Sequence, residues 1–109
     1  MGIRMTFELV YPKDIAAICA DMDTTIIDLR ARRDFERGHI DGAVNYEEEQ
    51  RSGLMSVLSD QKNYVLYCEH GGNSMQLARK LGQRGYRVAT LVGGYRGYQS
   101  YLRSLRESM

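Results

Sequence analysis

Long apolar runs, a signal segment and an imbalance of charge are all missing from this sequence of 109 residues. No apolar run approaches the roughly 20 residues that span a bilayer, so we expect no membrane partner. The stretch MGIRMTFELV lacks the apolar core and the small-residue cleavage site of a secretory signal, which predicts a cytoplasmic protein. The formal net charge is +1, so the overall charge does not indicate binding to nucleic acid or to an anionic membrane.

Cysteine is scarce as well. The chain has two cysteines, Cys19 and Cys68, which argues against a disulfide framework in a protein expected to be cytosolic. Cys19 lies in DIAAICADM on one apolar stripe with Ile15 and Ile18, so we expect it to pack in the core. That leaves Cys68 as the cysteine whose position needs another explanation.

What the sequence does contain is an ordinary globular composition, 43% hydrophobic and 27% charged, with no linker, repeat or low-complexity segment. Its length fits one domain over residues 1–109. Strands are expected at TFELV, at TTIIDL, at the end of DGAVNY, at YVLY and at YRVATLV. Helices are expected over residues 12–21, within RARRDFERGHI, within EEEQRSGLMSVLS, over residues 74–84 and within YRGYQSYLRSLRES. This alternation predicts an α/β domain with a mostly parallel five-stranded sheet flanked by helices on both faces.

Some side chains in these elements carry their own expectations. The run EEE at 47 to 49 should be a solvated helix start, followed by Leu54, Val57 and Leu58 facing inward. His39 should bond the backbone at its turn. Three tyrosines spaced three apart should pack the last helix onto the sheet, namely Tyr95, Tyr98 and Tyr101.

The stretch CEHGGNS, residues 68 to 74, carries the strongest indication of chemistry. Cys68 follows the apolar run YVLY and precedes a predicted helix that begins near Ser74, so it should lie at the carboxyl end of a parallel strand, where ligands collect. Free amides and the helix dipole at such a position favour an anion and lower the pKa of a thiol. Gly71 and Gly72 permit the backbone angles that curl successive amides around the sulfur. The alternative is a buried cysteine beside an ordinary glycine turn.

Three segments resemble the signatures of rhodanese-like domains. IIDLRARRDFERGHIDGAVN is similar to the first signature, YVLYCEHGGNS to the active-site segment and LVGGYRGY to the closing strand and its Gly-Gly turn. They span roughly residues 26 to 98 in the expected order. The resemblance implies a rhodanese-like fold and a sulfurtransferase that needs no cofactor or metal.

The resemblance also implies roles for residues. Cys68 is then the nucleophile that takes a sulfane sulfur from a donor, thiosulfate or a persulfide, and passes it to a thiol or another nucleophilic acceptor. The expected partners are thus a small-molecule or protein-bound donor and a thiol acceptor. The amides of residues 69 to 73 form the cradle. The cradle and substrate-binding residues are then Glu69, His70, Gly71, Gly72, Asn73 and Ser74. His70 has two open interpretations, assistance in proton transfer or a solvated loop residue.

Asn73 departs from the family pattern, which usually has arginine there. An arginine offers a fork of donors to an anionic donor molecule, whereas Asn73 brings no charge and is expected at most to donate hydrogen bonds or to cap the following helix. Arg96 is a candidate for the missing charge. Asp28 and Arg30 flank a strand end and are expected to pair or to bond neighbouring loops, and the alternative is that Asp28 borders the site. The departure favours a narrowed range of donors, or else a catalytically weak or inactive domain that binds a partner or senses reactive sulfur.

Phosphatase chemistry fits less well. Relatives of this fold that act on phosphate have one more residue between cysteine and arginine, and position 74 here is serine. Without an arginine or a metal ion, the charge of a phosphoryl transition state is poorly met.

Overall fold

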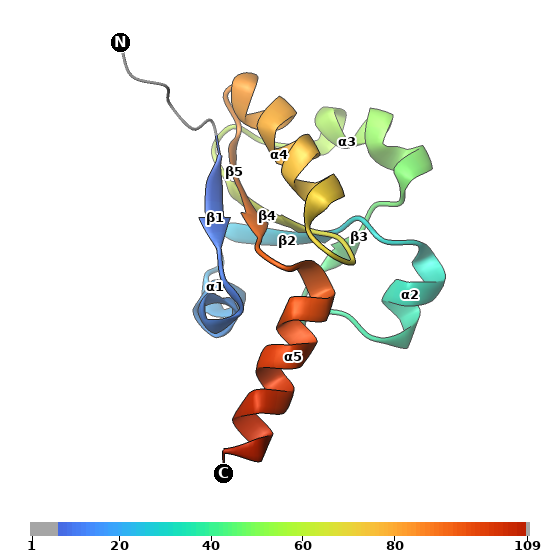
Figure 1. Ribbon diagram of the computed structural model, residues 1–109. Coiled ribbons are helices and arrows are strands. Elements are labelled where there is room, and N and C mark those ends of the chain that lie inside the picture. The colour runs from blue at the N-terminus through green and yellow to red at the C-terminus, as the bar shows by residue number, and fades with distance from the viewer. Residues whose placement is uncertain (1–6, 109) are drawn as a thin grey trace.

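The computed structural model describes residues 7–108, which form a five-stranded sheet of order β1-β5-β4-β2-β3 (Figure 1). Every pair of neighbouring strands is parallel. The predicted α/β class is therefore confirmed, and the sheet is fully parallel. In chain order the elements are β1 (Glu8–Val10), η1 (Pro12–Asp14), α1 (Ile15–Ala20), β2 (Thr24–Asp28), α2 (Arg32–Arg37), β3 (Val44–Asn45), η2 (Glu48–Gln50), α3 (Arg51–Val57), β4 (Asn63–Tyr67), α4 (Gly72–Gln83), β5 (Arg87–Leu91) and α5 (Gly94–Glu107).

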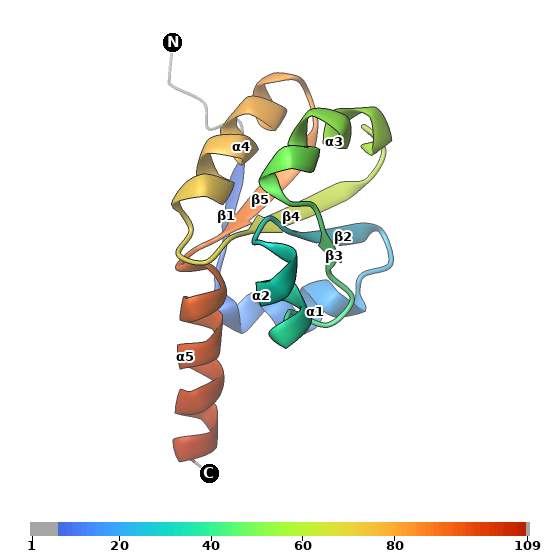
Figure 2. The same ribbon diagram turned by 90° about the vertical axis from the view of Figure 1, so that its right-hand side faces the viewer.

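Helices cover both faces of the sheet, as predicted. Figure 2 shows α3 and α4 on one side, and α1, α2 and α5 on the other. The central strand β4 explains this arrangement, because its apolar side chains alternate between the two cores. Val65 and Tyr67 belong to the core beneath α1 and α5, whereas Tyr64 and Leu66 belong to the core beneath α3 and α4.

The direction of the chain reverses between β2 and β4. From β2 the chain crosses by α2 to the edge strand β3, and from β3 it returns past β2 to β4. The helices that follow β2 and β4 therefore lie on opposite faces, and the loops at the two strand ends separate. Such a switch point is the usual ligand site of an open parallel sheet.

Two expectations about the core were wrong. Cys19 is exposed, since the short helix α1 turns Ile15 and Ile18 toward the sheet and leaves Cys19 outside that stripe. Its thiol donates to the carbonyl of Asp41 at 3.5 Å. Val57 is 59% exposed, because α3 ends at this residue and Leu54 takes the fully buried position.

Element boundaries also differ from the predictions. The first strand begins at Glu8, and Thr6 lies outside the described residues. Helix α4 begins at Gly72, two residues before the expected Ser74. Of the helices in residues 7–108, none has the length and apolarity that crossing a bilayer requires.

Candidate active site

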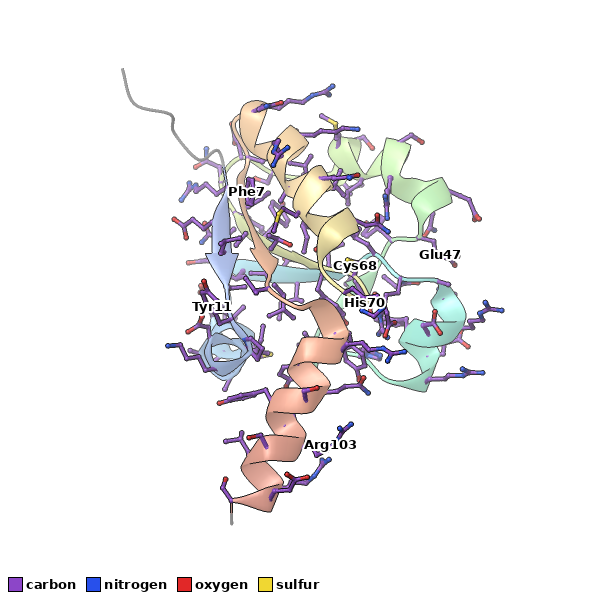
Figure 3. The ribbon with its side chains drawn as sticks, in the orientation of Figure 1. Phe7, Tyr11, Glu47, Cys68, His70 and Arg103 are labelled. Carbon is purple, nitrogen blue, oxygen red and sulfur yellow. The ribbon has the colours of Figure 1, made fainter. Side chains whose placement is uncertain are left out.

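Cys68 follows the carboxyl end of β4 directly and lies four residues before the start of α4. Figure 3 shows it where the end of the strand meets the first turns of α4 and α5. The residue is 6% exposed, so its sulfur sits at the bottom of the loop. Gly71 takes φ +110°, a left-handed conformation that favours glycine and lets the chain turn back toward the sulfur.

Backbone amides point at this sulfur. The amide of Gly71 donates to Cys68 Sγ at 3.0 Å, and the amide of Ser74 donates at 3.4 Å. The Ser74 hydroxyl lies 3.6 Å from the sulfur and is fully buried. Beneath it, the hydroxyl of Thr90 on β5 lies 2.7 Å from Ser74 Oγ. Sequence reasoning did not identify Thr90, because it comes from a different strand with no motif around it.

These contacts shift the pKa of the Cys68 thiol. Burial alone raises the pKa of the Cys68 thiol, but the hydrogen bonds from Ser74, Gly71 and Asn73 outweigh it, and the pKa lies below that of an ordinary cysteine. A lowered pKa increases the thiolate fraction near neutral pH, and the thiolate is the nucleophilic form.

The N-terminus of α5 is hydrogen-bonded to the loop that follows Cys68. The amides of Tyr95 and Arg96 donate to the carbonyls of Cys68 and Glu69 at 2.8 and 3.1 Å. A Cβ on Gly94 would lie 2.6 Å from both carbonyl oxygens, so this approach requires glycine. Because the carbonyls of Cys68 and Glu69 face α5, the amides later in the loop are free to face the sulfur. The sequence indicated a Gly-Gly turn here but not this role.

A chain of alternating charges runs beside the loop. Asp28, fully buried, pairs with Arg30 at 2.7 Å, and Arg30 reaches Glu69 at 3.8 Å. Glu69 also pairs with Arg96 at 3.2 Å. Arg96 thus lies near the site, as anticipated, but its charge is matched by Glu69. Asp28 pairs with Arg30, as expected, and does not line the cavity, so the alternative place at the border of the site is not the one it takes.

The remaining loop residues differ in placement. Glu69 is half-buried and lines the cavity beside the sulfur, whereas His70 is exposed and does not line that cavity. Asn73 is exposed and lines it. The expected cap by Asn73 was wrong, because α4 has already begun at Gly72 and its N-cap is Gly71, with no side-chain hydrogen bond.

A cavity of about 370 Å³ opens over Cys68. It lies outside the carboxyl ends of β2 and β4, at the switch point of the sheet. Two of its residues were expected to be a solvated helix start, Glu47 and Glu49, and Arg51 was not singled out at all. They reach the site because the return from β3 to β4 carries the start of α3 over the end of β2. The lining residues are Leu29, Arg30, Ala31, Asp34, Glu47, Glu49, Arg51, Cys68, Glu69 and Asn73.

Other singled-out residues lie away from the sulfur. His39 bonds the carbonyl of Phe35 at 2.7 Å and stacks on its ring, which confirms a structural role at the turn. Tyr95 and Tyr98 pack on the core, as predicted, whereas Tyr101 is half-buried beside Tyr11 and does not belong to that core. In the part of the chain that the structure describes, no three His, Cys, Asp or Glu residues are arranged to hold a metal ion.

Comparison with known proteins gives one family. The sequence model of the rhodanese-like domain matches residues 11–101. The tRNA sulfurtransferase of Pyrobaculum aerophilum is 36% identical over 81 residues, covering 72% of this chain and 17% of the relative. The tRNA sulfurtransferase of Desulfurococcus amylolyticus is 32% identical over 96 residues, covering 88% of this chain and 19% of the relative. The thiosulfate sulfurtransferase GlpE of Shewanella oneidensis is 34% identical over 71 residues, covering 64% of this chain and 70% of the relative. The chain therefore spans less than a fifth of the two tRNA sulfurtransferases and most of the third relative.

Solved structures share the fold. Reduced Bacillus anthracis CoADR-RHD superposes with a TM-score of 0.81 at 23% identity, covering 91% of this chain and 18% of that chain. The rhodanese-related protein from Thermoplasma volcanium gives a TM-score of 0.78 at 20% identity, covering 87% and 93%. At these identities the likeness concerns the fold alone.

Proposed function

The chain belongs to the rhodanese-like domain family, and from that premise we propose that it is a sulfurtransferase that carries sulfane sulfur on Cys68. One observation supports this most strongly. The Cys68 sulfur accepts hydrogen bonds from the amides of Gly71 and Ser74 at the start of α4, and the pKa of the Cys68 thiol lies below the ordinary value. A cradle of this kind stabilises a thiolate and equally an anionic persulfide.

The proposed reaction has two steps. The Cys68 thiolate attacks the sulfane sulfur of a donor, the bond between that sulfur and the rest of the donor breaks, and the leaving group departs with the bonding electrons. An acceptor thiolate then attacks the outer sulfur of the Cys68 persulfide and releases the Cys68 thiolate. No electron is gained or lost overall, so the protein needs no redox cofactor for this cycle.

The donor class is part of the proposal. Asn73 supplies no charge at the position where the family usually has arginine, and Arg96 is engaged by Glu69. Both observations disfavour thiosulfate, a dianion, and favour a persulfide as donor. Named relatives include thiosulfate and tRNA sulfurtransferases, which supports sulfur transfer as the general reaction.

Mass spectrometry of the protein after incubation with thiosulfate or with a small persulfide tests the proposal. We expect a gain of one sulfur on Cys68, lost on treatment with a thiol and absent in Cys68→Ser. A protein that folds but takes no sulfur from any donor contradicts it, and favours the second candidate, a domain that binds a partner without catalysis. The replacement at Asn73 is the observation behind that second candidate.

A further inference from the structure

Charges of both signs line the cavity over Cys68. Two arginines, Arg30 and Arg51, face it together with four acidic residues, Asp34, Glu47, Glu49 and Glu69. A site built for a simple anion would have an excess of positive charge. Only the charges that have no partner within the protein are available to a ligand, so the ion pairs of each residue have to be considered.

Two of the six charges are matched within the protein. The carboxylate of Glu69 lies between Arg30 at 3.8 Å and Arg96 at 3.2 Å, and Arg30 is also bound by Asp28 at 2.7 Å. These four residues neutralise one another. Arg30 or Glu69 could bind a charged group of a ligand only if one of these ion pairs were broken.

Arg51 is different. It occupies the first position of α3, and its Nε is buried with no hydrogen-bond partner among the described residues. No described carboxylate lies within ion-pair distance of its guanidinium. A guanidinium offers several donors in a planar fork that matches a carboxylate. Among the described residues, Arg51 is thus a cation of this cavity without a partner.

Three carboxylates are also unmatched. Asp34, Glu47 and Glu49 line the same cavity and form no ion pair with a described cation. In Figure 3 Glu47 lies on the side of Cys68 toward α2 and α3. Three carboxylates against one guanidinium repel a dianion such as thiosulfate and attract an ammonium group.

We propose, on the basis of the sulfurtransferase function above, that the donor is a free amino-acid persulfide that carries both a carboxylate and an ammonium group. Arg51 binds the carboxylate, and Glu47 and Glu49 bind the ammonium. The Cys68 thiolate attacks the outer sulfur, the donor's S–S bond breaks, and the amino-acid thiolate leaves with the electron pair and takes a proton from water. The transferred sulfur stays on Cys68 as the persulfide.

The test compares four donors on the Cys19→Ser protein, which has Cys68 as its sole thiol. Cysteine persulfide has both groups, N-acetylcysteine persulfide lacks the ammonium, cysteamine persulfide lacks the carboxylate, and thiosulfate is the dianion. The rate of sulfur gain on Cys68 is followed by mass spectrometry. We expect cysteine persulfide to exceed each of the others by about tenfold, the effect of about 1.4 kcal/mol.

Variants assign each group of the donor to its partner. Arg51→Gln should abolish the advantage of cysteine persulfide over cysteamine persulfide and preserve its advantage over N-acetylcysteine persulfide. The double variant Glu47→Gln, Glu49→Gln should do the reverse. Arg103→Gln, far along α5 in Figure 3, is the matched control and should keep both ratios. Circular dichroism checks that every variant is folded.

The outcomes separate the two proposals. If thiosulfate or N-acetylcysteine persulfide reacts as fast as cysteine persulfide, or if Arg51→Gln leaves the ratios unchanged, the amino-acid persulfide is overturned while sulfur transfer stands. If the folded protein takes sulfur from none of the four donors, sulfur transfer itself is overturned.

Discussion

The amide of Tyr95 donates a hydrogen bond of 2.8 Å to the carbonyl of Cys68, which ties the first turn of α5 to the loop that holds the sulfur. This bond joins segments 27 residues apart and orients the loop. With the carbonyls of Cys68 and Glu69 turned toward α5, the amides of Gly71 and Ser74 are free to face the sulfur. The geometry of the sulfur site therefore depends on a helix that contributes no side chain to the sulfur.

Gly94→Ala should damage the fold and the site together. Gly94 has φ +63°, and its Cβ would meet two backbone carbonyls that cannot move aside easily. The left-handed conformation alone costs about 1–3 kcal/mol for a residue with a Cβ, and the clash adds to it. Chemical denaturation should show the loss of unfolding free energy.

Gly53→Ala is the control for that experiment. Gly53 lies in α3, where a Cβ meets nothing within 4 Å. Alanine there should stabilise the protein by about 0.5–1 kcal/mol, because glycine is the poorer helix former. Equal effects of the two substitutions would contradict the role of Gly94.

Ser74→Ala should raise the pKa of Cys68. Burial raises that pKa and Ser74 is the largest influence lowering it, through its amide and hydroxyl, so removing the hydroxyl shifts the balance toward the thiol. The ultraviolet absorbance of the thiolate, followed against pH in a Cys19→Ser background, measures the midpoint. Thr90→Val should produce a smaller rise, since Thr90 reaches the sulfur only through Ser74.

Ser56→Ala provides the matched control. Its hydroxyl bonds a carbonyl three residues earlier, as that of Ser74 does, but on the exposed surface of α3. An unchanged midpoint in Ser74→Ala would show that the amides alone set the pKa.

Stability should depend on pH through the same group. The folded pKa of Cys68 is lowered below that of an unfolded cysteine, about 8.5. The stabilisation is therefore fully present above the unfolded pKa and is lost as pH falls through the folded pKa. Unfolding free energies of the parent and Cys68→Ser, both carrying Cys19→Ser, should accordingly diverge as pH rises through this window, and parallel curves would argue against a lowered pKa.

Arg30→Met should destabilise the protein strongly. Arg30 compensates the buried charge of Asp28 and also stacks over Tyr95, with its guanidinium carbon 4.0 Å from the ring centre. Removing one partner of a buried pair costs about 3–5 kcal/mol. Arg32→Met breaks the exposed pair with Glu36 and should cost less than about 0.5 kcal/mol. If urea unfolding shows similar losses of unfolding free energy in the two variants, the buried pair contributes no more to stability than the exposed pair.

Asn73→Arg should increase turnover of thiosulfate. The new guanidinium lies at the cavity and counters its unmatched carboxylates, and one charged hydrogen bond is enough for about a tenfold gain. Gln76→Arg adds the same charge one helical turn further along α4 and should have little effect. Equal gains from both would indicate a general effect of charge instead of a contact at position 73.

The sequence by itself determined the architecture and the position of the candidate nucleophile, Cys68. Strand and helix patterns are local, so YVLY, TTIIDL and their neighbours predicted the sheet, and the spacing from Cys68 to the next helix predicted amides around a thiol. The sequence could not predict contacts made across the fold. Thr90 beneath Ser74, the amide of Tyr95 on Cys68 and Arg51 over the cavity come from elements distant in the chain, and only strand order and helix packing bring them together. Exposure of Cys19 and the cavity position of Glu47 were missed for the same reason, because a residue's surroundings depend on which elements cover it, and tertiary packing decides that.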